Sequence, residues 1–243
     1  MKISELFYSI QGEGKRSGSP SFFIRTNFCN LRCRFSSGNL CDTAYTSWYP
    51  EDNKNLGDVE ISFILGEYKK VNCADVVITG GEPTMYPEEL SVLCSELKKM
   101  NNNVFITIET NGTIINDFVD HTDLISVSPK LGSSIPFETE YEKMHGKNRI
   151  NIDVLKKYNS LKQKGAIDIQ WKFVFTSRND IMEILDLQSL VGFEYSDIYL
   201  MPEGITIDDL SKNRVLTIDA CKEFKFNYSE RIHILAWGNM RGV

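Results

Sequence analysis

Three of the six cysteines in this chain lie within thirteen residues, in the segment CNLRCRFSSGNLCDTAY that spans 29–45. Cys29, Cys33 and Cys41 are separated by three and then by seven residues. Three reduced thiolates at one place can bind a zinc ion or an iron–sulfur cluster. Structural zinc prefers four protein ligands, and the histidines lie far along the chain. A [4Fe–4S] cluster held by three cysteines leaves one iron open for chemistry; zinc, a reactive thiol and plain packing remain alternatives.

Composition limits the kind of protein that carries these thiols. Of 243 residues, 42% are hydrophobic and 25% are charged, as in a soluble globular protein with a sizeable core. A formal net charge of -6 argues against nucleic-acid binding, which usually requires a basic face. The N-terminus has no signal-peptide pattern, and no run approaches the roughly 18 apolar residues that cross a bilayer. We therefore expect a cytoplasmic protein without a membrane partner, in which thiols stay reduced.

Short β-rich runs alternate with helical patterns along the chain. The expected strands are 21–28, 74–80, 104–110, 124–130, 169–176, 198–204 and 231–237. The expected helices are 86–101, 151–165 and 207–224. Near-continuous apolar runs are typical of strands buried on both faces of a parallel sheet, and strand–helix alternation predicts βαβ units. The pattern predicts one α/β domain, either a partial barrel or an open sheet. Cys73, Cys94 and Cys221 are interpreted as small buried side chains of this domain.

Unusual residues follow these strands, at the edge where α/β enzymes place their active sites. GGEP follows 74–79, TNG follows 104–109, SPK follows 124–127 and MPEG follows 198–200. A glycine pair lets a backbone approach a ligand closely. A simple turn would also explain the glycines, but it would not explain the cysteine triplet that precedes them.

Together with CNLRC and CDTAY, the TGGEP segment resembles the radical S-adenosylmethionine superfamily, whose usual loop is C-x₃-C-x₂-C. The resemblance is closer to the 7-carboxy-7-deazaguanine synthase family and covers essentially the whole chain. It rests on FYSIQGEGKRSGSPSFFIRTNFCNLRC, CDTAY, VVITGGEP, IETNGT, VSPK and WGNMRGV, in that order. It implies a partial (β/α) barrel of the radical SAM type, with mostly parallel strands and outer helices. One core domain would span 1–243, with N-terminal and C-terminal family extensions.

The resemblance implies a lyase that converts 6-carboxy-5,6,7,8-tetrahydropterin to 7-carboxy-7-deazaguanine and ammonia, in queuosine or other 7-deazapurine biosynthesis. An electron from the [4Fe–4S] cluster would cleave S-adenosylmethionine to methionine and a 5′-deoxyadenosyl radical, which takes a hydrogen from C6 of the substrate. The ring then contracts with the help of Mg²⁺, and the hydrogen returns. The cofactors carry the hard chemistry, while the protein binds, orients and shields them.

The resemblance also assigns roles to individual residues. The cluster ligands would be Cys29, Cys33 and Cys41, and the Mg²⁺ ligand would be Thr43. The residues expected to bind S-adenosylmethionine are Gly81, Glu109, Ser128, Pro129 and Lys130. The residues expected to bind substrate are Ile10, Gln11, Gly12, Glu13, Arg25, Thr79 and Val243, the last through its terminal carboxylate. A guanidinium fork matches a carboxylate in two places, which favours Arg25 as the substrate's cation. A structural salt bridge remains the alternative for Glu109.

The third cysteine departs from the family pattern. Its usual position, three residues after the second cysteine, holds Ser36, and CDT follows five residues later. We interpret Ser36–Leu40 as an insertion that bulges the loop and returns Cys41 to the same iron. Ser36 is the weaker ligand, because an alkoxide suits this thiolate site poorly. Leu40 stands where an aromatic residue usually contacts the adenine, and Met201 stands where relatives often have a glutamine.

Two other functions fit part of the pattern. An activase that makes a glycyl radical in a partner protein would share the cysteine loop and GGEP, but it would not need QGEG, Arg25 or CDT. A zinc-stabilised binding module would use the cysteines structurally. For the synthase, the resemblance leads us to expect a pterin substrate, a flavodoxin or ferredoxin as electron donor, and a homodimer.

Overall fold

The structure is a computed structural model that describes residues 1–243. Its centre is one nine-stranded sheet in the order β3-β1-β2-β4-β5-β6-β7-β8-β9. The strands are β1 (Lys2–Ile10), β2 (Pro20–Thr26), β3 (Gly57–Asp58), β4 (Asp75–Gly80), β5 (Phe105–Thr110), β6 (Leu124–Val127), β7 (Asp168–Phe175), β8 (Ile198–Pro202) and β9 (Asn227–Tyr228). Every neighbouring pair from β2 to β9 is parallel, whereas β1 is antiparallel to both β2 and β3. Because β3 and β9 do not pair with each other, the barrel stays open, as predicted.

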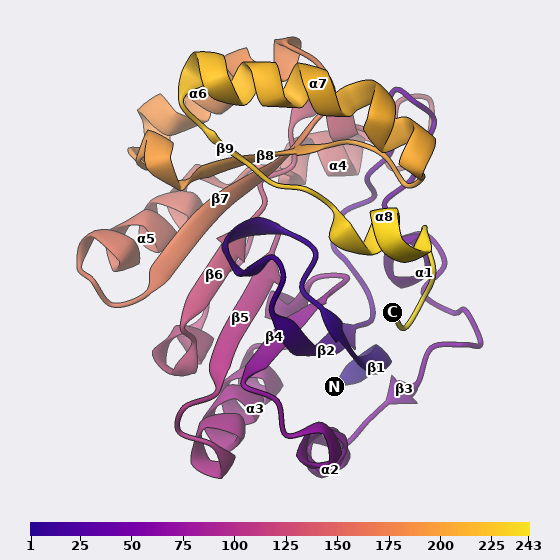
Figure 1. Cartoon of the computed structure of the whole chain (residues 1–243), viewed down its shortest axis with the longest axis vertical. Helices are drawn as coiled ribbons and strands as arrows, with labels where there is room; N and C mark the ends of the chain where they lie inside the picture. Colours follow the sequence, from indigo (N-terminus) through magenta and orange to yellow (C-terminus); the bar gives the residue numbers. More distant parts are fainter.

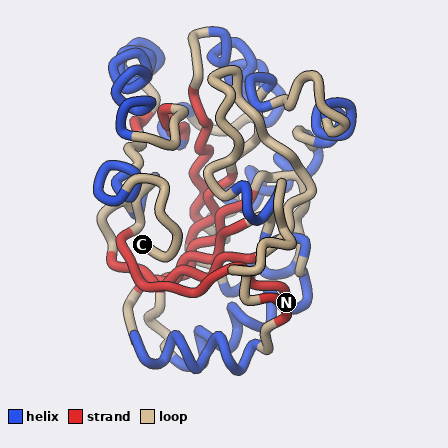
Figure 2. The backbone as a smooth tube through the Cα atoms, turned by 90° about the vertical axis from the view of Figure 1, so that its right-hand side faces the viewer, coloured by secondary structure: helices blue, strands red, loops and turns tan.

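Helices surround the curved sheet. They are α1 (Ala44–Ser47), α2 (Ile61–Val71), α3 (Pro87–Met100), α4 (Glu142–Asn148), α5 (Ile152–Gln163), α6 (Asn179–Val191), α7 (Ile207–Phe224) and α8 (Ile232–Trp237). In Figure 1, α2, α3, α5, α6 and α7 form an arc around the strands, while α8, α1 and the C-terminus lie on the other side. Figure 2 shows the strands in the middle of the molecule with helices around them. No helix is both long and apolar enough to cross a membrane.

The hydrophobic core lies between the sheet and the outer helices and contains 35 buried residues. The predicted stripe of α3 supplies Leu90, Leu93, Cys94 and Leu97, which are all fully buried. Cys94 and Cys221 are buried as predicted, and Cys73 is half-buried. Packing a helix stripe against a two-sided sheet is the arrangement that makes α/β layers stable.

The N-terminal QGEGKR segment fills the inner side of the open barrel. In Figure 1 this indigo loop crosses in front of the central strands. The backbone N–H of Lys15 donates to Oε1 of Gln170 on β7 at 2.7 Å, and that of Gly14 donates to Oγ of Ser229 at 2.8 Å. Arg16 forms an ion pair with Asp75 of β4 at 2.6 Å. The segment is thus bound to both halves of the sheet and closes the bottom of the site.

One predicted strand is wrong. Residues 231–237 form helix α8 instead, because β9 already pairs with β8 before the chain turns back across the barrel opening. Only Ile234 of this helix is buried. A short apolar run cannot distinguish a strand from a helix by its pattern alone. The other six predicted strands and the three predicted helices are present, while β1, α2 and α6 are elements that the sequence pattern did not reveal.

Candidate active site

The carboxyl ends of the parallel strands surround a cavity of about 170 Å³, which we call the cluster cavity. A smaller cavity of about 70 Å³, the inner cavity, lies against it. Predicted site residues that line only the cluster cavity are Cys29, Cys33, Cys41, Gly81, Ser128 and Lys130. Those that line only the inner cavity are Ile10, Gln11, Gly12 and Val243. The walls shared by both are Glu13, Arg25, Asp42, Thr43, Thr79 and Glu109. Pro129 alone among the predicted residues lines neither.

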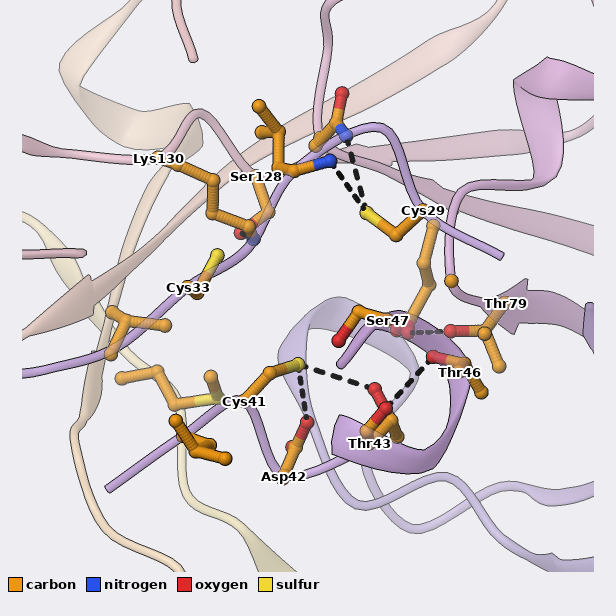
Figure 3. A pocket seen from close by; sticks show the side chains of 18 of the residues that line it. Cys29, Cys33, Cys41, Asp42, Thr43, Thr46, Ser47, Thr79, Ser128 and Lys130 are labelled. Carbon is orange, nitrogen blue, oxygen red and sulfur yellow. Dashed lines mark hydrogen bonds between the residues drawn. The ribbon is translucent and has the colours of Figure 1, made fainter. Parts of the chain in front are cut away.

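The three cysteine side chains point into one space (Figure 3). Cys29 follows β2, and its sulfur accepts a hydrogen bond from the backbone N–H of Leu31 at 3.4 Å. Burial raises the pKa of Cys29 to about 12, and it also raises the pKa values of Cys33 and Cys41. Buried thiols of this kind stay protonated until a metal ion displaces the proton.

The spacing of the sulfurs favours a cluster over a single ion. Only Glu13, Asp42 and His233 form a set of three ligand side chains whose atoms all lie within 4.8 Å of one another. At least two of the three cysteine sulfurs are therefore more than 4.8 Å apart. Around one tetrahedral zinc ion, thiolate sulfurs lie about 3.8 Å apart, given a bond length of about 2.3 Å. A wider triangle fits three corners of an iron–sulfur cube.

The inserted residues form a small hairpin. Arg34 and Leu40 make an antiparallel bridge, and the backbone N–H of Phe35 donates to the carbonyl of Asn39 at 2.9 Å. At its base, the N–H of Cys41 donates to the carbonyl of Cys33 at 3.2 Å. The chain therefore leaves the cysteine loop after Cys33 and returns Cys41 to the wall of the cavity.

The GGEP motif supports the cysteine loop directly. The N–H of Gly81 donates to the carbonyl of Thr26, and the N–H of Glu82 donates to that of Phe28. A Cβ on Gly81 would lie 1.8 Å from the carbonyl oxygen of Phe28. The close approach that this glycine allows is therefore to the backbone next to Cys29, as well as to the cavity. Glu82 is fully buried and accepts hydrogen bonds from Thr84, Thr110 and Asn111, which ties this turn to the end of β5.

The guanidinium of Arg25 lies at the boundary of the two cavities. Strand pairing places it opposite Glu5 of β1 and Thr79 of β4. Its Nε lies 2.6 Å from Oε1 of Glu5, which also accepts a hydrogen bond from the hydroxyl of Tyr45. The two terminal nitrogens of Arg25 have no hydrogen-bond partner in the protein. They remain available to a carboxylate in the cavities.

Buried ion pairs form the floor between the cavities. Lys172 of β7 lies 2.5 Å from Glu13 and 3.3 Å from Glu109. Arg231 pairs with Glu13 at 3.1 Å and also with Asp42. Burial opposes the ionisation of Glu13, but the charges of Lys172 and Arg231 outweigh it and lower its pKa. Since both cations already neutralise this group, Glu13, Asp42 and His233 do not form a vacant metal site.

Glu109 forms the structural salt bridge that was the alternative for it, and its role in binding S-adenosylmethionine stays a prediction. It accepts hydrogen bonds from Thr79 at 2.8 Å and from Gln11 at 3.3 Å, and it pairs with Lys172. It is therefore part of a salt bridge and also a wall of both cavities. In the cofactor motif, Nζ of Lys130 donates to Oγ of Ser128 at 2.9 Å. Both side chains face the cluster cavity.

Four residues of the site were not identified from the sequence. Lys172 and Arg231 supply the cations, and Asp42 and His233 line the cavities beside them. A lysine inside the apolar run IQWKFVF was an available signal, because lysine is rarely buried without a partner. Nothing in the sequence indicated a buried cation at Arg231, because the residues that follow it were wrongly predicted as a strand.

Known proteins share this arrangement. The family model of the Radical SAM superfamily matches residues 23–213. A 7-carboxy-7-deazaguanine synthase of Halobacterium salinarum is 37% identical over 98% of this chain and 91% of its own length. The chain belongs to the 7-carboxy-7-deazaguanine synthase family. A second member of the family, from Rhodopirellula baltica, is 36% identical over 99% of this chain and 88% of its own length.

Two solved structures share the fold of this 7-carboxy-7-deazaguanine synthase family member. The crystal structure of QueE from Escherichia coli matches with a TM-score of 0.63 at 25% identity, over 94% of this chain and 92% of that chain. SuiB of Streptococcus suis, bound to S-adenosylmethionine, shares the fold with a TM-score of 0.50 at 17% identity, over 84% of this chain and 48% of that chain. The radical SAM fold and the cysteine geometry together fit a [4Fe–4S] cluster with S-adenosylmethionine.

Proposed function

We propose that this protein converts 6-carboxy-5,6,7,8-tetrahydropterin to 7-carboxy-7-deazaguanine with loss of ammonia. One observation carries the proposal: the cluster cavity and the inner cavity share six wall residues, so a ligand on the cysteines and a ligand on the QGEG segment would touch. When bound, the reduced cluster and S-adenosylmethionine supply the radical that removes hydrogen from the substrate. The protein's part is to hold the two ligands together and to keep water away from them.

In this proposal, the residues divide according to the cavity that they line. Cys29, Cys33 and Cys41 hold the cluster. Gly81, Glu109 and the Ser128–Lys130 segment bind S-adenosylmethionine, with Pro129 shaping the turn. Substrate lies against Ile10–Glu13, Thr79 and Val243 in the inner cavity.

The substrate carboxylate would bind to the cavity-facing nitrogens of Arg25. The bicyclic edge of the substrate offers donors and acceptors to the Ile10–Glu13 segment. Since Lys172 and Arg231 keep Glu13 ionised, its carboxylate acts as a hydrogen-bond acceptor.

Thr43 is the proposed protein ligand of Mg²⁺. Its hydroxyl lies 3.3 Å from the sulfur of Cys41, and the residue lines both cavities. Mg²⁺ commonly takes few protein oxygens and completes its shell with substrate and water. A hydroxyl at this boundary suits an ion that would also hold the substrate carboxylate.

Three further parts of the proposal concern the surroundings of the enzyme. A flavodoxin or ferredoxin would supply the electron, and two copies of the chain would form a homodimer. The whole chain, 1–243, would act as one radical SAM core domain with family extensions at its ends. All six cysteines are free thiols, which supports a reducing, cytoplasmic location.

Anaerobic turnover tests the function. Reconstituted protein, S-adenosylmethionine, a chemical reductant and the carboxy-tetrahydropterin should give the absorbance of a deazapurine and release ammonia, and added Mg²⁺ should raise the rate. Cleavage of S-adenosylmethionine with no deazapurine would overturn the proposal and favour an activase. Protein that binds zinc in place of iron under the same conditions would favour the structural alternative.

A further inference from the structure

The inserted hairpin makes a polar contact with the opposite side of the cluster cavity. The Nδ2 of Asn39 donates to Oε1 of Glu203 at 2.9 Å and lies 3.3 Å from Oδ2 of Asp209. Glu203 follows β8, and Asp209 lies in the first turn of α7. One side-chain amide therefore joins the loop between two cysteine ligands to a strand end 164 residues away in sequence.

The buried carboxylate of Glu203 is held by this contact. The residue is 4% exposed and lines the cluster cavity. Its backbone is fixed by hydrogen bonds with Phe175 and Asn213. Its carboxylate accepts a hydrogen bond from no protein group except Asn39. A buried carboxylate without a donor is costly, so the amide and the acid stabilise each other in one position.

Apolar side chains from the same two segments face the cavity beside this contact. Phe35 and Leu40 come from the hairpin, and Met201 and Ile205 flank Glu203 on the other side. Apolar walls with a few placed polar groups are typical of sites that bind small organic molecules. The distance between these two walls is set by whatever holds the hairpin to β8.

We propose that Asn39 is a positioning residue, which latches the Arg34–Leu40 hairpin to Glu203 so that the nucleoside of S-adenosylmethionine binds between hairpin and strand end. This inference rests on the proposed function, since it assigns the apolar walls to that cofactor. The cysteines are held by separate contacts. Cys41 is bonded to the carbonyl of Cys33 at the base of the hairpin, and the indole N–H of Trp48 donates to the same carbonyl at 3.0 Å. Loss of the latch should therefore weaken cofactor binding and spare the cluster.

The test compares Asn39→Ala with Ser36→Ala in anaerobically reconstituted protein. Ser36 lies on the same hairpin, is exposed, and makes no side-chain hydrogen bond, so its variant is the matched control. Calorimetric titration with S-adenosylhomocysteine should show binding about tenfold weaker in the Asn39 variant, the effect of losing one hydrogen bond to a charged group. The iron content should stay at the wild-type level. Hydrogen exchange without ligand should become faster in the 34–41 segment of that variant alone.

A reciprocal exchange makes the test specific for the pair. Asn39→Asp should weaken binding more than Asn39→Ala, because it places a carboxylate next to Glu203 and Asp209. The double variant Asn39→Asp/Glu203→Gln again pairs an amide with a carboxylate. The amide is now at position 203 and the carboxylate at position 39. The double variant should bind S-adenosylhomocysteine more tightly than Asn39→Asp alone.

Three results would overturn the latch. The first is wild-type affinity in Asn39→Ala. The second is a loss of iron that matches the loss of affinity, since the residue would then serve only to fold the cysteine loop. The third is a double variant in which the losses of S-adenosylhomocysteine affinity caused by Asn39→Asp and by Glu203→Gln add together. Failure of the proposed function is a different result, in which the wild-type protein forms no cluster or makes no deazapurine.

Discussion

The ammonium nitrogen of Lys172 lies 2.5 Å from Oε2 of Glu13 and 3.3 Å from Oε1 of Glu109. Its side chain is only 5% exposed. Burial disfavours the charged amine, but Glu109 and Glu13 outweigh this effect and raise the pKa of Lys172. The lysine thus stays charged at a point where the walls of both cavities meet.

Replacing Lys172 by Met should destabilise the protein and impair turnover together. Removing one partner of a buried ion pair leaves an uncompensated charge and costs about 3–5 kcal/mol. Urea unfolding of the metal-free protein measures the loss of stability. Lys156→Met, at an exposed position on α5, should change the free energy of unfolding by less than about 0.5 kcal/mol. Equal effects of the two substitutions would contradict the role of the pair.

Gly81→Ala should reduce cluster assembly. The new Cβ would meet the carbonyl oxygen of Phe28 at 1.8 Å and the backbone nitrogen of Cys29 at 3.1 Å, so the first cysteine has to move. Iron content after reconstitution and thermal unfolding report the change. Gly66→Ala in α2 is the control, because nothing lies near that glycine. There, alanine should stabilise the helix by about 0.5–1 kcal/mol. Normal iron content in Gly81→Ala would refute the close-approach argument.

His145 fixes the first half of the cysteine loop. Its Nδ1 accepts a hydrogen bond from the backbone N–H of Arg32 at 3.1 Å, and its Nε2 lies 3.1 Å from Oγ of Ser134. The acceptor role of Nδ1 requires the neutral ring. Burial, with the charges of Arg149 and Lys130, lowers the pKa of His145 from 6.5 to about 4.

This shift predicts a pH dependence of stability. Since the pKa of the folded state lies below that of the unfolded chain, the contribution of neutral His145 is complete above pH 6.5 and is lost as the pH falls towards 4. The full loss is about 3 kcal/mol, at about 1.4 kcal/mol per pKa unit. His145→Asn retains an acceptor but does not titrate here, so the difference in unfolding free energy between wild type and variant should shrink across this range. A constant difference from pH 7.5 to pH 4 would show that the imidazole is not the titrating group.

The parallel strands and the position of the site could be predicted from the sequence. Strands such as β4 and β7 are buried on both faces. Such strands consist of nearly uninterrupted apolar residues, and this pattern identified them in the sequence. The end of each such strand then gave the position of a motif. The place of Cys41 beside the other two cysteines could also be predicted, because CDT follows the loop.

What could not be predicted depends on contacts between distant parts of the chain. β1 is a half-exposed antiparallel strand, and its side chains do not form the continuous apolar run of the parallel strands. Arg231 reaches Glu13 over 218 positions in sequence, and Asn39 reaches Glu203 over 164. No local pattern encodes such a pairing. Lys172 is the intermediate case, since a lysine in a buried strand shows that a partner exists but not which one.

Iron content after anaerobic reconstitution tests the central claim most directly, namely that Cys29, Cys33 and Cys41 together hold one [4Fe–4S] cluster. The wild-type protein and Ser36→Ala should each contain about four irons per chain, and Cys41→Ala should contain much less. An unchanged iron content in Cys41→Ala, or a loss of iron in Ser36→Ala, would contradict the claim.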